Sequence, residues 1–398
     1  MSLGQPGRSF TAVQTASRLR LRARPPRSIG VFAAVVATVF GLVHAMIWWR
    51  LVGSAGLGGA TAGVLTAGLV TLYVAVPLAM AGRYLGDRLP GWVGRLGFTW
   101  IGLMFYWFAL SILAEPLVQA ANLLSPSGPW GMAAAAVVAT VGGGLSVAAL
   151  RGARQPAVVR VDVPIAGLDP RLEGFKIVQV SDLHVGPTVD RAFVQGVVDK
   201  INAEGADLVA LTGDIVDGPI SQLGGSVAPL GTIRSRHGTY FVTGNHEYYA
   251  GAPAWCAHFG DMGIRVLRNE RVAVEHDGAS LDVAGIDDPF AMGPGHGPDM
   301  ARALYGRDRS RPVVLLAHQP VVADEAARHG VTLQLSGHTH GGQLWPFVHF
   351  VKLVQPFVAG LHRLADTWVY VSRGTAWWGP PMRLGAPNEI TLLTLRPA

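Results

Sequence analysis

The feature that most constrains this chain is a set of four apolar stretches within its first 150 residues. Each is long enough for the roughly 20 helical residues that cross a bilayer. The first is followed by Trp48, Trp49 and Arg50 rather than by a small-residue cleavage site, so we expect an anchor that stays in the protein and not a signal peptide. The stretches predict a four-helix transmembrane domain whose members cover about 29–49, 57–80, 98–124 and 129–150.

The arginines flank these stretches mainly on one side. Residues 1–155 hold 12 of the 32 Lys and Arg residues, but only Asp87 and Glu115 of the 26 acidic ones. The opposite side would carry only Arg50. The positive-inside rule therefore predicts a multi-pass protein of the inner cell membrane with a basic cytoplasmic tail at 1–28 and a cytoplasmic carboxyl-terminal half. The arginines on the predicted inner side include Arg18, Arg20, Arg22, Arg24, Arg27, Arg83, Arg88, Arg95, Arg151 and Arg154.

Two polar residues fall inside the apolar stretches. Glu115, next to Pro116, is either a functional ionisable group or a residue near the far membrane interface. His44 has no second donor near it in the sequence, so we expect it to pack between helices.

The charge balance argues against a nucleic-acid partner. Residues 156–398 retain 20 basic and 24 acidic side chains, and a nucleic-acid-binding domain is expected to present a basic face. The basic residues of the first half instead favour a lipid bilayer as the partner. Cys256 is the only cysteine, which excludes an intrachain disulfide and a cysteine-based metal site.

The pattern of apolar residues in the sequence changes after Pro156. We expect a linker and domain entry at 151–171, followed by one α/β domain at 172–398. Near-continuous apolar runs with intervening helices, predicted at 190–203 and 320–329, are typical of a buried sheet. The six expected strands lie in FKIVQVSD, ADLVALTGD, GTYFVTGNH, SLDVAGIDD, RPVVLLAHQ and VTLQLSGH.

Five of these strands end in a cluster of metal-binding residue types. Ligands gather at the carboxyl ends of strands in such sheets, so the clusters are expected to face one pocket. The donors are nitrogen and oxygen only, which suits Mn²⁺, Fe, Zn²⁺ or Mg²⁺. They are too many for one ion and suit two, which would be bridged by a carboxylate and would activate a bridging hydroxide. The residues are Asp182, His184, Asp214, Asp217, Asn245, His246, Glu247, His318, His338 and His340.

Glycines precede several of these residues. Gly213, Gly244 and Gly337 stand where the backbone is expected to turn sharply after a strand, a conformation that glycine permits.

The blocks DLH, GDIVD, GNHE, a single histidine and GHTH resemble, in this order, the calcineurin-like metallophosphoesterases. The resemblance covers about 172–396 and implies a two-sheet sandwich flanked by helices. It implies a first metal on Asp182, His184, Asp214 and His340. It implies a second metal on Asp214, Asn245, His318 and His338. By the same resemblance Asp214 bridges the two metals, His246 is the catalytic acid, and Asp217 and Glu247 orient the ligands.

A narrower resemblance links KIVQVSDLHVG, GHTHGGQ and the late VSRGTAWWGPPMRLGAPNEITLLTL to a bacterial membrane-associated branch of this family. Some members of that branch cleave the pyrophosphate of UDP-diacylglucosamine. Here Arg373, Trp377 and Trp378 are the expected substrate contacts. The tryptophan pair either touches lipid, since tryptophan favours the bilayer interface, or packs against the edge of the domain.

Three functions remain open at this stage. The first is a membrane-anchored, two-metal hydrolase, with Mn²⁺ favoured, acting on a phosphodiester or pyrophosphate that includes lipid-linked candidates. The second is a phosphodiesterase for soluble substrates such as cyclic nucleotides, with the helices as a tether. The third is a catalytically silent membrane sensor or transport-associated protein, against which the intact set of ligands argues.

Overall fold

The computed structural model describes residues 27–85, 90–291 and 297–398. The chain forms two compact units, Met1–Leu42 and Val43–Ala398. Most of the predicted tail at 1–28 and Arg88 lie outside the described residues. The side chains of Arg27 and Arg83 also lie outside them.

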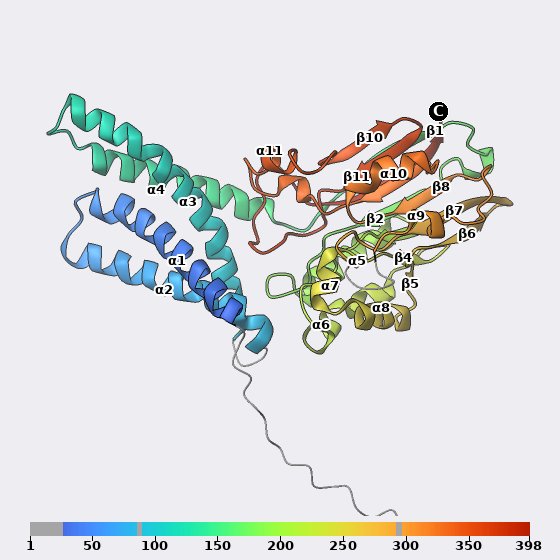
Figure 1. The fold of residues 1–398 in the computed structure, drawn as a ribbon, viewed down its shortest axis with the longest axis horizontal. Coiled ribbons are helices and arrows are strands. Elements are labelled where there is room, and N and C mark those ends of the chain that lie inside the picture. The colour runs from blue at the N-terminus through green and yellow to red at the C-terminus, as the bar shows by residue number, and fades with distance from the viewer. Residues whose placement is uncertain (1–26, 86–89, 292–296) are drawn as a thin grey trace, which may run out of the picture. The chain divides into compact units, whose positions relative to one another are not determined.

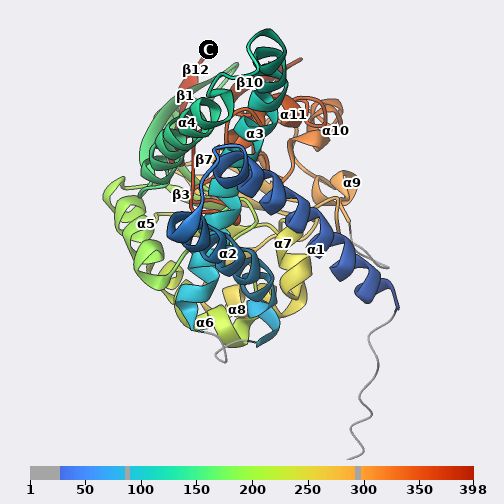
Figure 2. The same cartoon turned by 90° about the vertical axis from the view of Figure 1, so that its left-hand side faces the viewer.

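Four helices are long and apolar enough to cross a membrane. The third begins at Gly91 rather than near 98, because extended Pro90 precedes a helix that already includes the less apolar 91–97. Within Val43–Ala398, α3 packs against both α2 and α4 (Figure 2). The bounds are α1 Arg27–Trp48, followed by the π-helical turn η1 Trp49–Gly53, then α2 Gly59–Leu85, α3 Gly91–Leu124 and α4 Trp130–Gly152.

The two polar residues expected inside the apolar stretches have partners. Fully buried Arg50 forms an ion pair with Glu115, which also accepts a hydrogen bond from Gln119 at 2.7 Å. His44 is buried and accepts a hydrogen bond from Trp100 Nε1 at 2.8 Å, which confirms that it packs between helices. Since Arg50 follows α1 directly, Glu115 lies at the level where that helix ends.

Two six-stranded mixed sheets form the carboxyl-terminal half (Figure 1). The first has the order β1-β12-β2-β3-β4-β5, and the second has β10-β11-β9-β8-β7-β6. The strands of the first are β1 Ala157–Ile165, β2 Lys176–Val180, β3 Leu208–Leu211, β4 Thr239–Phe241, β5 Arg265–Val266 and β12 Glu389–Pro397. Those of the second are β6 Glu270–His276, β7 Ala279–Gly285, β8 Val313–Leu316, β9 Leu333–Ser336, β10 Gly360–Leu364 and β11 Thr367–Val371.

Apolar side chains on both faces of the central strands explain this layered arrangement. Ile177 and Leu208 of the first sheet and Val283, Leu316 and Leu335 of the second belong to one buried cluster between the sheets. Alternate residues of the same strands face the flanking helices in two further clusters. The expected fold class, four apolar helices followed by a helix-flanked two-sheet sandwich, is confirmed.

The flanking helices include both of those expected from the sequence. The predicted helix at 190–203 is α5, and the one at 320–329 is η5 together with α10. The remaining segments are short. Their bounds are α5 Arg191–Ala203, α6 Ile220–Val227, α7 Asn245–Ala250, α8 Ala252–Asp261, α9 Met300–Ala303, α10 Ala323–Arg328 and α11 Val348–Val351, with 3-10 turns η3 Pro170–Leu172, η4 Ala228–Thr232, η5 Pro320–Val322 and η6 His340–Gly342.

The segment 151–171 is not only a linker. It contains β1, which pairs in parallel with β12 along its whole length, from Ala157 opposite Glu389 to Ile165 opposite Pro397. β1 is an edge strand, and most of its residues are half-buried or exposed. The sequence therefore lacks the continuous apolar run by which the central strands are recognised.

Candidate metal centre

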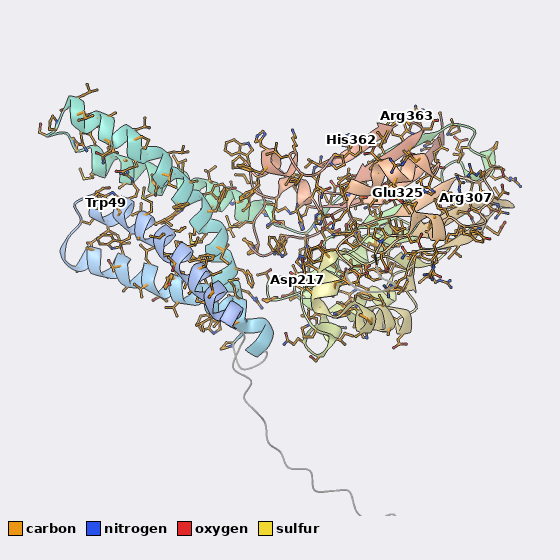
Figure 3. The ribbon with its side chains drawn as sticks, viewed as in Figure 1. Trp49, Asp217, Arg307, Glu325, His362 and Arg363 are labelled. Atoms are coloured by element: carbon orange, nitrogen blue, oxygen red, sulfur yellow. The ribbon has the colours of Figure 1, made fainter. Side chains whose placement is uncertain are left out.

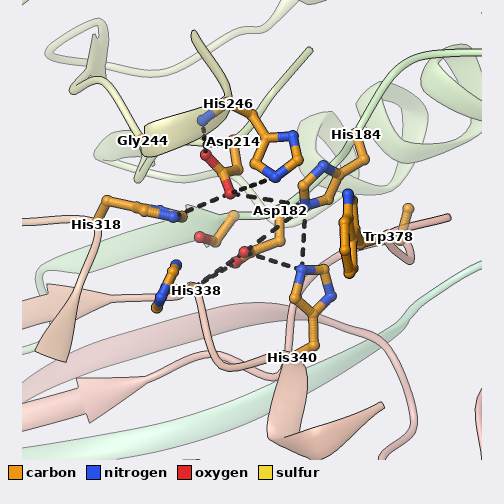
Figure 4. A network of polar contacts seen from close by, with 12 residues as sticks. Asp182, His184, Asp214, Gly244, His246, His318, His338, His340 and Trp378 are labelled. Atoms are coloured by element: carbon orange, nitrogen blue, oxygen red, sulfur yellow. Dashed lines mark hydrogen bonds and ion pairs between the residues drawn. The ribbon is translucent and has the colours of Figure 1, made fainter. Parts of the chain in front are cut away.

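The metal-binding residue types follow β2, β3, β4, β8 and β9. Because β2, β3 and β4 run parallel, as do β8 and β9, the carboxyl ends of each set lie at one edge of their sheet. The two edges bring five loops together, and the side chains of these loops lie close to one another (Figure 4).

One group of potential ligands consists of Asp182, His184 and His340. The two Nε2 atoms of His184 and His340 are 3.1 Å apart, and His340 Nε2 is 3.3 Å from Asp182 Oδ1. Asp182 and His184 are almost fully buried. Three donor side chains thus point at one small volume.

A second group consists of Asp214, His318 and His338. His318 Nδ1 lies 2.8 Å from the carbonyl oxygen of Thr212, which can only accept, so Nδ1 is a donor and Nε2 is the ring atom turned toward Asp214. Asp214 Oδ2 lies 3.1 Å from His318 Nε2 and 3.8 Å from His184 Nε2. The Asp214 carboxylate therefore stands between the two groups, where a bridging ligand would be.

The residues fit divalent metal ions. Asn245 Oδ1 is a buried atom without a hydrogen-bond partner among the described residues, an arrangement that is costly unless a ligand satisfies it. Burial lowers the pKa of His338 to about 3 and lowers that of His340 well below its usual range. Both imidazoles are consequently neutral at pH 7, the form that binds a metal.

Five of the ligand side chains leave the backbone from left-handed positions. The φ angles are 55° at Asp182, 46° at His184, 53° at Asp214, 70° at His338 and 51° at His340. Residues other than glycine adopt this region uncommonly, and such strain concentrates at functional sites. The backbone is thus bent at the ligands themselves.

The glycines before the ligands act differently from one another. Gly213 has a φ of 90°, as the predicted sharp turn requires. Gly244 and Gly337 do not have positive φ angles; instead, a Cβ on Gly337 would collide with Ser181 and Asp182, and one on Gly244 with Asp214. These two positions need glycine because a ligand loop passes directly against them, and the expected sharp turn is wrong for them.

Asp217 holds two histidines at once. Its Oδ1 lies 2.7 Å from His184 Nδ1 and 2.7 Å from His246 Nδ1. His246 Nε2 then faces Asp214 Oδ2 at 3.9 Å. Burial lowers the pKa of His246, but the hydrogen bond to Asp217 and the charge of Asp214 outweigh it and raise that pKa to about 9.

Glu247 anchors the loop that carries Asp214. Its buried carboxylate accepts hydrogen bonds from Gly244 N at 2.7 Å, Ile215 N at 2.7 Å and Asp214 N at 3.0 Å. It therefore ties the loop after β3 to the start of α7.

Sequence reasoning missed Arg383 and Asp288. Arg383 is buried, donates from Nη1 to the carbonyl oxygen of His340 at 3.0 Å, and places Nη2 3.2 Å from His340 Nδ1. Buried Asp288 follows β7 and accepts from Gln319, the neighbour of His318, at 3.0 Å. Asp288 stands in the acidic end of SLDVAGIDD, whereas nothing in the sequence around Arg383 distinguishes it from a surface arginine.

The three expected substrate contacts lie in three different environments. Trp377 is 5% exposed and donates to Thr188 Oγ1 at 3.1 Å, as expected for packing within the domain. Arg373 forms an ion pair with buried Glu389 at 2.6 Å. Trp378 is 56% exposed, and its ring centroid lies 5.9 Å from that of His246 (Figure 4). Only Trp378 both borders the site and faces outward.

Other histidines lie away from this centre. His362 and Arg363 are on β10, in the sheet opposite the one that carries the Asp217 loop (Figure 3). His237 Nε2 and His276 Nδ1 hydrogen-bond to each other at 3.0 Å, near an Asp207 carboxylate that accepts from Lys176 N at 2.8 Å. In that second cluster the two imidazoles pair with each other, and Asp207 pairs with the backbone of Lys176.

The model of the calcineurin-like phosphoesterase family matches residues 175–342. The transmembrane protein with metallophosphoesterase domain of Danio rerio is 38% identical over 335 residues, which are 79% of this chain and 76% of that protein. Its counterpart from Bos taurus is 45% identical over 280 residues, 67% of this chain but only 62% of that protein. A solved dimetal phosphatase from Danio rerio is 13% identical with a TM-score of 0.37, covering 56% of this chain and 99% of that one.

Proposed function

We propose that this chain, which belongs to the calcineurin-like phosphoesterase family, is a membrane-anchored hydrolase of a lipid-linked phosphodiester or pyrophosphate. The observation that supports this most is the position of the Asp214 carboxylate between His318 and His184. One carboxylate flanked by two groups of imidazoles is the donor pattern of two-metal hydrolysis of phosphate esters.

The ligands divide between two ions. We assign Asp182, His184 and His340 to the first, and Asn245, His318 and His338 to the second, with Asp214 shared by both. When bound, two such ions supply a water of lowered pKa and neutralise charge on the phosphoryl oxygens. Imidazole ligands together with carboxylates favour Mn²⁺ over Mg²⁺.

His246 is the proposed general acid. Its raised pKa keeps it protonated at neutral pH, and Asp217 fixes the ring through Nδ1, so that Nε2 faces the space beside Asp214. From this position it can donate a proton to the leaving oxygen. Trp378 borders the same space and is the proposed contact for the substrate's leaving group.

The membrane arrangement is part of the proposal. The tail at 1–28 and the phosphoesterase domain at 172–398 lie on the cytoplasmic side of the inner membrane, with the four helices as the anchor. The arginines that flank the helices support this orientation. A domain fixed at the bilayer surface meets lipid-linked substrates at high local concentration, which supports the lipid class over soluble diesters.

Metal analysis combined with a substrate panel tests the proposal. The full-length protein in detergent should contain two divalent ions per chain and hydrolyse lipid-linked diesters or pyrophosphates faster than soluble diesters. Asp214→Asn should lower both the metal content and the rate, the latter by at least about 10³-fold. Asp366→Asn, at a fully exposed aspartate, is the matched control. Equal turnover of soluble and lipid-linked diesters would contradict the lipid class, and a metal-free, inactive wild type would contradict the enzyme.

A further inference from the structure

The segment Trp345–Val354 begins two residues after the GHTHGGQ motif and includes α11. Five large apolar side chains of this segment are between 42% and 81% exposed. Lys352 is its only charged residue. The exposed residues are Trp345, Phe347, Phe350, Leu353 and Val354.

Such a concentration of exposed apolar residues is unusual for a surface that faces water. Contiguous apolar patches on proteins mark sites of protein or membrane interaction. A tryptophan, phenylalanines and a leucine exposed around a short helix, with a lysine among them, form the composition of segments that lie in the membrane interface.

The patch is continuous with a candidate membrane span. Within Val43–Ala398, the ring centroid of Phe347 lies 4.9 Å from that of Phe105 in α3. Leu344, immediately before the segment, is buried in one cluster with Tyr106 of α3 and Ala149 of α4. Because α3 and α4 are both apolar enough to cross a bilayer, the segment stands where those helices meet the domain.

The segment is also tied to the metal centre. Gln343 Nε2 donates to the carbonyl oxygen of Trp378 at 3.0 Å, and Gln343 Oε1 accepts from Trp378 N at 3.0 Å. Trp378 in turn borders His246. Three residues after His340, Gln343 therefore links the start of the patch to the outward-facing rim of the site.

We propose that Trp345–Val354 inserts its apolar side chains into the lipid bilayer and holds the rim of the metal centre at the membrane surface. The occupant is the lipid itself, because the patch adjoins membrane-spanning helices and carries almost no charge. This inference deepens the proposed function by indicating how a lipid-linked phosphate ester would reach the site without leaving the bilayer.

Fluorophore labelling of the full chain tests the insertion without using activity. In a Cys256→Ser background, an environment-sensitive NBD label is attached at Phe350→Cys, and as a control at Tyr305→Cys, where an 85% exposed tyrosine lies outside the segment. The protein is reconstituted in vesicles of phosphatidylethanolamine and phosphatidylglycerol. Lipid-borne nitroxide should quench the label at position 350 at least threefold more than the label at 305, and aqueous iodide should show the reverse.

Two results would overturn the insertion. One is equal quenching of both labels by iodide. The other is protection at position 350 that lipid nitroxide does not quench and that weakens as the protein is diluted in lipid, since this would indicate a second copy as the occupant.

An activity measurement separates this inference from the proposed function. Leu353→Glu should lower hydrolysis of a vesicle-held phosphodiester about tenfold and leave that of soluble bis(p-nitrophenyl) phosphate within twofold of the wild type. Unchanged hydrolysis in vesicles counts against the inserted segment alone. If the wild type cleaves neither substrate, the proposed function fails, whereas the quenching result still decides the insertion.

Discussion

The guanidinium of Arg383 holds His340 at two points, by donating to its carbonyl oxygen at 3.0 Å and by lying 3.2 Å from its Nδ1. The backbone N–H of Arg383 donates to the carbonyl oxygen of Ala149, near the end of α4, at 2.8 Å. One buried residue thus connects a candidate membrane span to a candidate metal ligand.

Replacing Arg383 should loosen His340. Arg383→Ala is expected to weaken metal binding by about 10- to 100-fold, because partners that orient a ligand typically contribute that much to affinity. The measurement is a titration of metal-depleted protein with Mn²⁺, followed by the rate of diester hydrolysis. Excess Mn²⁺ should restore part of the rate. Arg363→Ala, at a half-exposed arginine on β10, is the control and should leave the titration unchanged.

The pH dependence should report His246. A general acid works while protonated, so kcat/KM should fall as the pH rises through the pKa of His246, which in the metal-free site Asp217 and Asp214 raise to about 9 against the effect of burial. Asp217→Asn removes one of those charges and should move the fall to lower pH by about one unit. A substrate with a p-nitrophenolate leaving group needs no proton donor and should show a weaker fall. An identical profile for the variant would count against the assigned acid.

Gly337 should be intolerant of a side chain. Gly337→Ala would push a methyl group into Ser181 and Asp182, so we expect loss of metal binding and a free energy of unfolding lower by about 1–3 kcal/mol. Gly260→Ala in α8 meets open space and should be neutral or stabilising by up to about 1 kcal/mol. Thermal denaturation with and without chelator distinguishes the two. Equal stability of the two variants would show that the loop yields.

Arg50 and Glu115 should stabilise the folded protein only when both are present. Glu115→Gln leaves the fully buried Arg50 without its counter-charge, and breaking such a pair costs about 3–5 kcal/mol. The expected result is a clearly lower melting temperature in detergent micelles. Arg50→Met combined with Glu115→Gln should recover much of the loss, since no uncompensated charge remains. Additive losses in the double variant would show that the two residues act independently.

The candidate ligands could be chosen from the sequence because their chemistry and spacing are local. Each block places donors within a few residues after an apolar strand, and parallel pairing then brings the strand ends together. Edge strand β1 and the role of Arg383 were not predictable in this way. β1 depends on pairing with β12, which lies more than 200 residues away in the sequence. The contact of Arg383 with His340 arises only when the loops that carry them pack together. The burial of Trp377 beside exposed Trp378 likewise depends on tertiary packing.

The left-handed residues of the metal centre affect how stable the folded domain is during purification and storage. Each left-handed residue raises the free energy of the folded state by about 1 kcal/mol or more relative to an unstrained conformation. Ions that bind only the folded chain offset this cost by mass action. Chelation should therefore lower the stability of the folded domain as well as its rate of hydrolysis. The metal content of a preparation would then indicate the fraction of the protein that is folded.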